Sequence, residues 1–279
     1  MVSSLLVGLR EGLEASVIVA ILIAYLAKRD LRSYIPRVWL GVFAAVVVSL
    51  GAATLLYATS NELSDTSAEI FEGVTSVLAA GLITWLTFWM ANHARAMKSE
   101  LHSKVDAALT GSSYALVGVA FFAVLREGLE TAIFMFPNSQ VAGSALQSFI
   151  GLWIGLSISV AVGFAIYKGV IKLNLGKVFS VVGALLIVVA AGVLNYGIHE
   201  FQEAGVIGFG TDIALDTTGF IATDGLVGSL LRGFLSYRGS ASVLEVFVWI
   251  TFMAVVGSLY LSKLRSDNKA VETKVAVKQ

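Results

Sequence analysis

The sequence of 279 residues contains no cysteine, only two prolines and only 14% charged residues. Because cysteine is missing, disulfides, thiolate metal sites and thiol catalysis are excluded. A soluble domain of this size carries about a quarter charged residues, whereas here 57% of the residues are hydrophobic and the mean hydropathy is +0.85. No cationic segment precedes the first apolar run, so the N-terminus does not resemble a cleaved signal peptide. We predict an all-α integral membrane protein.

Long apolar runs are abundant, and several approach or exceed the roughly 20 residues that span a bilayer. We predict seven transmembrane helices, at 4–27, 38–58, 73–91, 113–136, 149–167, 178–198 and 243–261. The second, third, fifth and sixth contain no Asp, Glu, Lys or Arg, whereas the first and fourth contain three charges each. We expect one transmembrane domain over 1–261, followed by a basic tail over 262–279.

Basic residues are nearly absent from one side of the predicted bundle. The segments 28–37, 92–112, 168–177 and 262–279 hold 15 of the 19 Lys and Arg residues. The opposite segments, 59–72, 137–148 and 199–242, hold two of them together with nine acidic residues. Because cytoplasmic loops carry the excess of Lys and Arg, we predict an outer N-terminus and a cytoplasmic C-terminus.

The hexapeptide LREGLE occurs twice, at 9–14 and at 125–130. Three predicted spans separate the beginnings of the two units, so the two copies cross the membrane in opposite directions. We therefore predict an inverted repeat of about 1–91 and 113–198, with the helix at 243–261 outside it; transporters use such repeats to build a site where the halves meet. At 1.5 Å per residue, Glu11 and Glu127 both lie about 12–14 Å below the outer surface.

The charges of the first copy, Arg10, Glu11 and Glu14, fall within a helical sector of about 100°. Arg10 and Glu14 are four residues apart and close enough to pair, and Glu11 and Glu14 can converge on one ion. Gly12, like Gly128 in the second copy, leaves a small surface that lets a neighbouring backbone approach. Ionisable groups at this depth face the bundle interior or a wet cavity.

The two copies together carry four glutamates and two arginines, a formal charge of −2. Ion pairing alone needs one carboxylate per arginine, so the surplus must be protonated or matched by a cation. Carboxylates without Cys or His in the spans favour hard ions such as Mg, Ca, Mn or iron. Residue chemistry leaves three classes open: a hard-metal transporter, a proton-coupled carrier, and a membrane enzyme with paired carboxylates. The enzyme is weakest, because the spans show no nucleophile–base pair, phosphate loop or HExxH.

The two R-E-G-L-E motifs, in the first and fourth of seven helices, resemble those of the oxidase-dependent iron transporter family. The similarity to its bacterial members continues through IFEG at 70–73, TWLTFWM at 84–90, FFAVLREGLE at 121–130, KLNLG at 172–176, EAG at 203–205 and EVFVW at 245–249. The resemblance implies a high-affinity iron permease of the cytoplasmic membrane that moves iron ions inward. The alternative is a proton-coupled carrier of another hard cation or solute that protonates the same glutamates.

Specific roles follow from the resemblance. It implies that iron in transit binds Glu11, Glu14, Glu127 and Glu130, and that Arg10 and Arg126 orient these carboxylates. It also implies an extracytoplasmic partner that oxidises or delivers iron, such as a cupredoxin-like protein, a haem peroxidase or a multicopper oxidase. We expect iron as substrate, membrane lipid around the helices, no permanently bound cofactor and no nucleic-acid partner.

Further polar residues near the predicted outer ends are either ordinary helix-end and surface groups or ligands where the ion enters: Glu69, Glu72, His199, Glu200, Glu203, Asp212, Asp216 and Glu245. Acids that begin a helix commonly complement its dipole. HEFQE at 199–203 lacks the second His of a metal-binding helix motif, which favours a lone interfacial histidine. Asp212 and Asp216 only loosely match an acidic loop motif of the fungal members. The long loop at 199–242 could include a short interfacial or re-entrant helix at 225–235.

Overall fold

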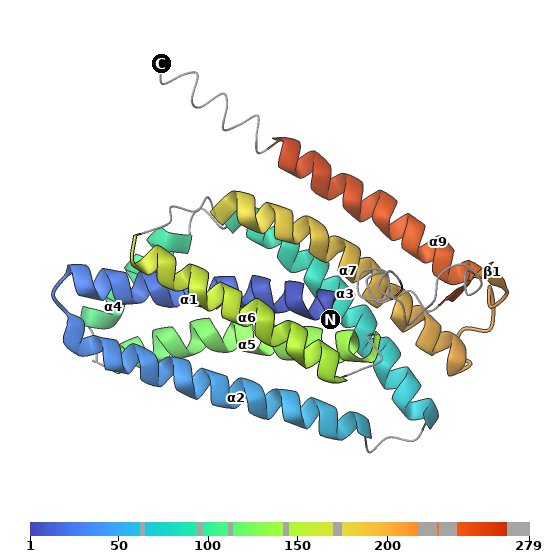
Figure 1. Cartoon of the computed structure of the whole chain (residues 1–279), viewed down its shortest axis with the longest axis horizontal. Coiled ribbons are helices and arrows are strands. Elements are labelled where there is room, and N and C mark those ends of the chain that lie inside the picture. The colour runs from blue at the N-terminus through green and yellow to red at the C-terminus, as the bar shows by residue number, and fades with distance from the viewer. Residues whose placement is uncertain are drawn as a thin grey trace.

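The computed structural model describes residues 1–61, 65–93, 97–110, 114–141, 145–169, 175–216, 228 and 239–266. Its helices are α1 (Val2–Lys28), η1 (Arg32–Tyr34), α2 (Ile35–Asn61), α3 (Asp65–His93), α4 (Met97–Thr110), α5 (Ala115–Val141), α6 (Ala145–Tyr167), α7 (Leu175–Glu203) and α9 (Val243–Phe252). A π-helical turn, η2 (Met253–Gly257), follows α9, and helix resumes as far as Ser266. Strands β1 (Ile213–Asp216) and β2 (Ser240–Ser242) form an antiparallel pair. Figure 1 shows the long helices lying side by side as one bundle.

Within the described ranges, five helical stretches are long and apolar enough to cross a membrane: Arg32–Thr59, Thr66–Met90, Leu146–Tyr167, Gly176–Glu203 and Val243–Ser266. Helices α1 and α5 are each 27 residues long, and each carries the three charged residues of one LREGLE copy. Backbone groups in lipid must be satisfied within the helix, which favours these long uninterrupted helices. The all-α prediction is confirmed. The count of seven crossings, their direction and the inverted repeat stay predictions.

Several helices extend beyond the apolar runs from which they were predicted. Helix α3 begins at Asp65 rather than near 73, and α7 continues to Glu203 rather than ending near 198. Hydropathy marks where the apolar run ends, whereas the hydrogen-bonded backbone continues into the polar interface. Glu72 therefore lies two turns inside α3, too far from the helix start to complement its dipole. The 225–235 segment, apart from residue 228, and the last 13 residues of the predicted tail lie outside the described residues.

The long helices pack in three pairs: α1 along α6, α2 along α5, and α3 along α7. If α1, α2 and α3 are exchanged with α5, α6 and α7 respectively, the α1–α6 pair becomes the α2–α5 pair, and the α3–α7 pair is unchanged. This exchange symmetry is common to parallel and inverted repeats, so the inverted orientation stays a prediction.

Small residues four positions apart bring α1 and α6 into close contact. They are Gly8, Gly12 and Ser16 on α1, and Gly151, Gly155, Ser159 and Gly163 on α6. Ser159 Oγ donates a hydrogen bond to the carbonyl oxygen of Leu9 at 2.8 Å, across the helix pair. Small side chains at helix interfaces in membranes let backbones approach and gain van der Waals contact. This stripe holds the first LREGLE copy firmly against α6.

The two motif glycines occupy equivalent places in their helix pairs. A Cβ on Gly12 would lie 2.8 Å from the Cβ of Ser159, and one on Gly128 would lie 2.1 Å from Ser49 Oγ. Ser49 donates a hydrogen bond to the carbonyl of Ala45 on its own helix, and the single O–H of Ser159 is shared between the carbonyls of Leu9 and Gly155. Serine side chains therefore occupy the space beside both motif glycines, and the close backbone approach predicted for them is found instead at Gly8, Gly151 and Gly155.

Replacing Gly155 by alanine should destabilise the protein, because its Cβ would lie 2.3 Å from the carbonyl oxygen of Leu5 and 2.6 Å from the nitrogen of Leu9. Neither backbone atom can move aside as a side chain can. We expect a loss of about 1–3 kcal/mol, the usual range for overpacking, measured by thermal unfolding in detergent. The matched control is Gly81→Ala on α3, where no atom of the described residues lies within 4 Å of the new Cβ. Equal stability of the two variants would contradict the close α1–α6 contact.

Helix α4 is amphipathic, with one apolar face buried against the bundle. Leu101, Val105 and Ala108 pack with residues of α1 and α5 in one apolar cluster. On its polar side Asp106 accepts hydrogen bonds from the hydroxyl of Tyr25 at 2.6 Å and from Arg29 at 2.8 Å. The three apolar residues stand at positions i, i+4 and i+7 and so share one face of the helix, which is stabilised by burial. Helix α4 therefore covers one end of α1 and α5.

Candidate functional site

Carboxylates from the two LREGLE copies converge at one buried point. Glu11 and Glu14 on α1 and Glu127 on α5 are all buried, and each offers an oxygen within 4.8 Å of the other two. The motifs are 116 residues apart in sequence and meet because α1 and α5 pack against each other. The expected convergence is therefore present for three of the four motif glutamates.

The carboxylate oxygens of this cluster are incompletely hydrogen-bonded. Among the described residues, one buried oxygen of each motif glutamate has no hydrogen-bond partner: Glu11 Oε2, Glu14 Oε1, Glu127 Oε2 and Glu130 Oε2. Buried polar atoms without partners are rare in folded proteins and call for a proton, a water molecule or an ion. These four oxygens are ligands that a hard cation prefers.

Arg10 binds a different glutamate from the one that the spacing suggests. Arg10 Nη1 bonds to Glu11 Oε1 and lies 3.9 Å from Glu130 Oε2, so Arg10 bridges α1 and α5. No ion pair joins Arg10 to Glu14 among the described residues, because Glu14 is directed to the cluster with Glu127. The expected Arg10–Glu14 pair is thus corrected to an Arg10–Glu11 pair.

The second motif keeps the i,i+4 pair that the first lacks. Arg126 Nε lies 2.9 Å from Glu130 Oε1, and its guanidinium carbon lies 4.6 Å from the centre of the Trp89 ring. The side chain of Arg126 is 41% exposed, whereas that of Arg10 is 3% exposed. Glu130 is therefore neutralised by arginine, and the cluster of three glutamates with Arg10 carries a formal charge of −2.

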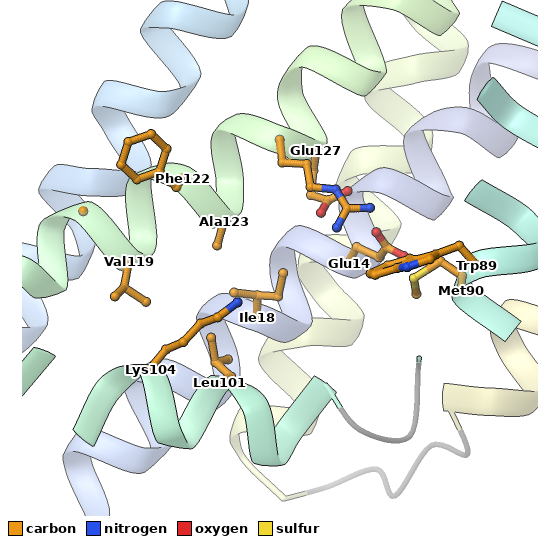
Figure 2. Close-up of a pocket in the computed structure, with 12 residues that line it drawn as sticks. Glu14, Ile18, Trp89, Met90, Leu101, Lys104, Val119, Phe122, Ala123 and Glu127 are labelled. Atoms are coloured by element: carbon orange, nitrogen blue, oxygen red, sulfur yellow. The ribbon is translucent and has the colours of Figure 1, made fainter. Parts of the chain in front are cut away.

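One cavity extends from this cluster towards α4. It has a volume of about 480 Å³, and Glu14, Glu127 and Arg126 lie on its wall together with Leu101 and Lys104 of α4. Figure 2 shows Glu14 and Glu127 reaching from two helices to the same part of this cavity, while Lys104 and Leu101 line it from α4. The cavity joins the carboxylates to the end of the bundle that α4 covers.

A second cavity lies on the other side of the cluster. Its volume is about 780 Å³, its wall is mostly apolar, and its polar residues include Glu11, Glu127, Ser49, Thr131 and Tyr57. Thr131 and Tyr57 lie further along α5 and α2 from Glu127 and Ser49, in the direction away from α4. Glu127 thus lines both cavities, Glu11 faces only the second, and Glu14 faces only the first.

The residues suggested as ligands where the ion enters separate into three sets. His199, Glu200 and Glu203 form a second group of metal-ligand atoms within 4.8 Å of one another, and Glu245 contacts His199. Glu72 accepts a hydrogen bond from the hydroxyl of Tyr196. Glu69, Asp212 and Asp216 belong to neither of the two groups of metal-ligand atoms in the described part of the chain.

Sequence reasoning missed six residues near the motif charges, Ser49, Tyr57, Trp89, Lys104, Thr131 and Ser159, and it missed Tyr196, which binds Glu72. Trp89 lies in TWLTFWM, one of the segments that carry the family resemblance, so a signal for it was present. Ser159 has a signal too, because it continues the spacing of four residues from Gly151 and Gly155. Nothing in the sequence indicates the other five.

A multi-pass helical membrane protein with buried carboxylates between two cavities belongs to the class of membrane transport proteins. Residues 1–267 match the iron permease FTR1 family, and the chain belongs to this family. It is a permease, not an enzyme, and iron is its substrate. The resemblance found in the motifs and their flanking segments is thereby confirmed.

The relatives are similar over nearly their whole length. The chain is 36% identical over 257 residues to the protein named ferrous iron permease EfeU in Escherichia coli O6:K15:H31, covering 89% of this chain and 91% of the relative. The same values hold for the EfeU of Shigella sonnei. The EfeU of Yersinia pestis is 35% identical over 264 residues, covering 94% of this chain and 93% of the relative. No solved structure matches the chain.

Proposed function

We propose that the chain is a high-affinity ferrous iron permease that carries iron ions inward across the cytoplasmic membrane through the glutamates of its two RExxE motifs. The observation that carries this proposal is the convergence of Glu11, Glu14 and Glu127 with unpaired oxygens inside a helical bundle. Relatives of similar length named ferrous iron permeases support the choice of Fe²⁺.

The charge of the cluster fits a divalent ion. Three carboxylates and Arg10 sum to −2, so Fe²⁺ makes the site neutral, whereas Fe³⁺ leaves a net positive charge in a low-dielectric interior. An isolated charge in such surroundings is strongly disfavoured. Carboxylate oxygens exchange readily, which allows the ion to leave as well as to bind.

The two cavities suggest the order in which the glutamates act. The ion reaches Glu11 and Glu127 from the 780 Å³ cavity and passes to Glu14 and Glu127, from which it enters the 480 Å³ cavity beside α4. Glu127 holds the ion throughout this step because it lines both cavities. Glu130 joins the ligands only when it is released from Arg126, so we assign it a secondary role, with Arg10 and Arg126 orienting the carboxylates.

The direction rests on the predicted arrangement of seven crossings. The excess of Lys and Arg on the loops predicts that α4 and the smaller cavity lie on the cytoplasmic side. An inside-negative potential then favours inward movement by about 2.3 kcal/mol per charge per 100 mV, roughly twice that for a divalent ion. The sequence shows no phosphate-binding loop, so we propose transport without direct ATP use.

Delivery of iron at the outer face belongs to the same proposal. The family resemblance favours an extracytoplasmic partner that oxidises or hands over iron, of the cupredoxin-like, haem peroxidase or multicopper oxidase kind. If such a partner supplies Fe³⁺, the −2 charge of the cluster requires reduction, a bound anion or a further carboxylate. Glu130 is the nearest candidate for that carboxylate.

The direct test is uptake by the purified chain in proteoliposomes under anaerobic conditions. We expect Fe²⁺ to accumulate when a potassium gradient and valinomycin make the interior negative, and the rate to fall as the potential is removed. A proton-coupled carrier of another solute predicts instead a flux driven by a pH gradient, with no accumulation of iron. Iron uptake that is absent at every potential would overturn the proposal.

A further inference from the structure

A second group of ligand atoms lies where α7 ends beside the start of α9, at the end of the bundle opposite α4 (Figure 1). His199, Glu200 and Glu203 each offer one atom, and these atoms lie within 4.8 Å of one another. His199 and Glu203 are one helical turn apart, so they project from the same face of α7. The group is thus built on a helix rather than on a loose loop.

The imidazole of His199 is held between two carboxylates. Its Nδ1 lies 3.0 Å from Glu245 Oε1, and its Nε2 lies 3.2 Å from Glu203 Oε1. A neutral imidazole has one N–H, so it can donate to only one of them. The other ring nitrogen then presents a lone pair to a carboxylate oxygen, and two acceptors at this distance need a proton or a cation between them.

Glu245 is placed to decide which nitrogen keeps the proton. Its side chain is only 4% exposed, and its backbone N–H donates to Ser242 Oγ at 3.2 Å in the first turn of α9. A histidine that binds a metal usually donates its other N–H to a carboxylate, which fixes the tautomer and the ring orientation. With Nδ1–H donated to buried Glu245, the free Nε2 faces Glu203, whose side chain is 55% exposed and open to solvent.

We propose that His199 Nε2, Glu203 and Glu200 form a second divalent-metal site, oriented by Glu245, that binds Fe²⁺ before it reaches the glutamates of the RExxE motifs. The order of binding rests on the proposed function, whereas the site itself rests only on the geometry at the end of α7. An imidazole with carboxylates suits Fe²⁺, Mn²⁺, Co²⁺ and Zn²⁺ better than Mg²⁺ or Ca²⁺. The proposed site would therefore select transition metals first. The all-carboxylate cluster of Glu11, Glu14 and Glu127, which discriminates less between divalent ions, would bind them afterwards.

The test uses the imidazole as a label, because the chain has only three histidines. The full chain in lipid nanodiscs is loaded anaerobically with Fe²⁺, and iron K-edge X-ray absorption reports imidazole scattering while equilibrium dialysis counts bound ions. We expect imidazole scattering in the unchanged protein, and its loss together with about one binding equivalent in His199→Ala. The matched controls, His93→Ala and His102→Ala, should keep both.

Two further variants separate this site from general damage to the fold. Glu203→Gln changes an exposed side chain, so it should leave folding intact and still weaken Fe²⁺ binding at this site. Glu245→Gln removes the orienting carboxylate and should weaken it by about 10–100-fold, the usual effect of losing such a partner. Glu14→Ala should keep the imidazole signal, because Glu14 belongs to the other group.

The outcomes distinguish the inference from the proposed function. Imidazole scattering and stoichiometry that are unchanged in His199→Ala would overturn the second site, whether or not the protein transports iron. Conversely, an imidazole signal lost in His199→Ala supports the second site even if proteoliposomes fail to accumulate Fe²⁺, a result that would overturn only the transport proposal. In transport, we expect His199→Ala to lower uptake most at the lowest Fe²⁺ concentrations, where capture limits the rate.

Discussion

Uptake of Fe²⁺ into proteoliposomes should fall to the level of protein-free vesicles when Glu14 or Glu127 is replaced by alanine. Each variant removes one of three converging carboxylates and changes the formal charge of the cluster from −2 to −1. Loss of a direct ligand should weaken binding by more than the ~10–100-fold that follows loss of an outer partner. Glu127→Ala should be the more damaging of the two, because Glu127 lines both cavities.

Control variants separate this effect from misfolding. Glu14→Gln retains the size of the side chain and should also abolish uptake, because an amide does not supply the charge. Asp216→Asn changes an exposed carboxylate outside both groups and should transport like the unchanged protein. Normal uptake by both Glu14→Ala and Glu127→Ala, with protein present in the vesicles, would exclude these glutamates as ligands.

Arg10→Ala should destabilise the folded protein far more than Arg126→Ala does. The side chain of Arg10 is buried between Glu11 and Glu130, whereas that of Arg126 is 41% exposed. Removing one partner of a buried ion pair typically costs about 3–5 kcal/mol, and exposed pairs contribute about 0–1 kcal/mol. The difference is measured by thermal unfolding of the two variants in the same detergent.

A double-mutant cycle tests whether the Arg10 effect arises from the uncompensated carboxylate. Adding Glu11→Ala to Arg10→Ala should restore part of the lost stability, because the stranded charge is removed with its partner. Adding Glu11→Ala to Arg126→Ala gives the matched control and should restore none. Equal destabilisation by the two single arginine variants would mean that the two motifs are equivalent, as their identical sequences suggest.

The unequal burial of the arginines has a clear origin in packing. Helix α1 contacts α4, α5, α6 and α7, so its motif is surrounded by other helices. On α5, Arg126 lies at the cavity beside α4 and stacks on Trp89. Identical hexapeptides therefore have different roles: the first supplies two cluster carboxylates and a buried arginine, and the second supplies Glu127 and an arginine–glutamate pair.

The sequence by itself determined the class of the protein and predicted the charged residues of its candidate site. Apolar runs predicted where helices lie, because a backbone in lipid must satisfy its own hydrogen bonds. The surplus of two carboxylates over arginines predicted a bound cation or proton, and the repeated motif with its flanking segments identified the family, which the comparison confirmed. The basic loops predicted the orientation, which stays a prediction.

Only the tertiary structure decided which charges meet. Helical periodicity fixes angles on one helix, but the helix that lies opposite and the side-chain rotamers fix the contacts. For this reason the spacing suggested an Arg10–Glu14 pair, whereas in the structure Arg10 binds Glu11. The spacing also did not distinguish Glu130, which pairs with Arg126, from the other three motif glutamates. For the same reason a histidine that looked isolated in the sequence meets Glu245, 46 residues away, once α9 packs beside α7.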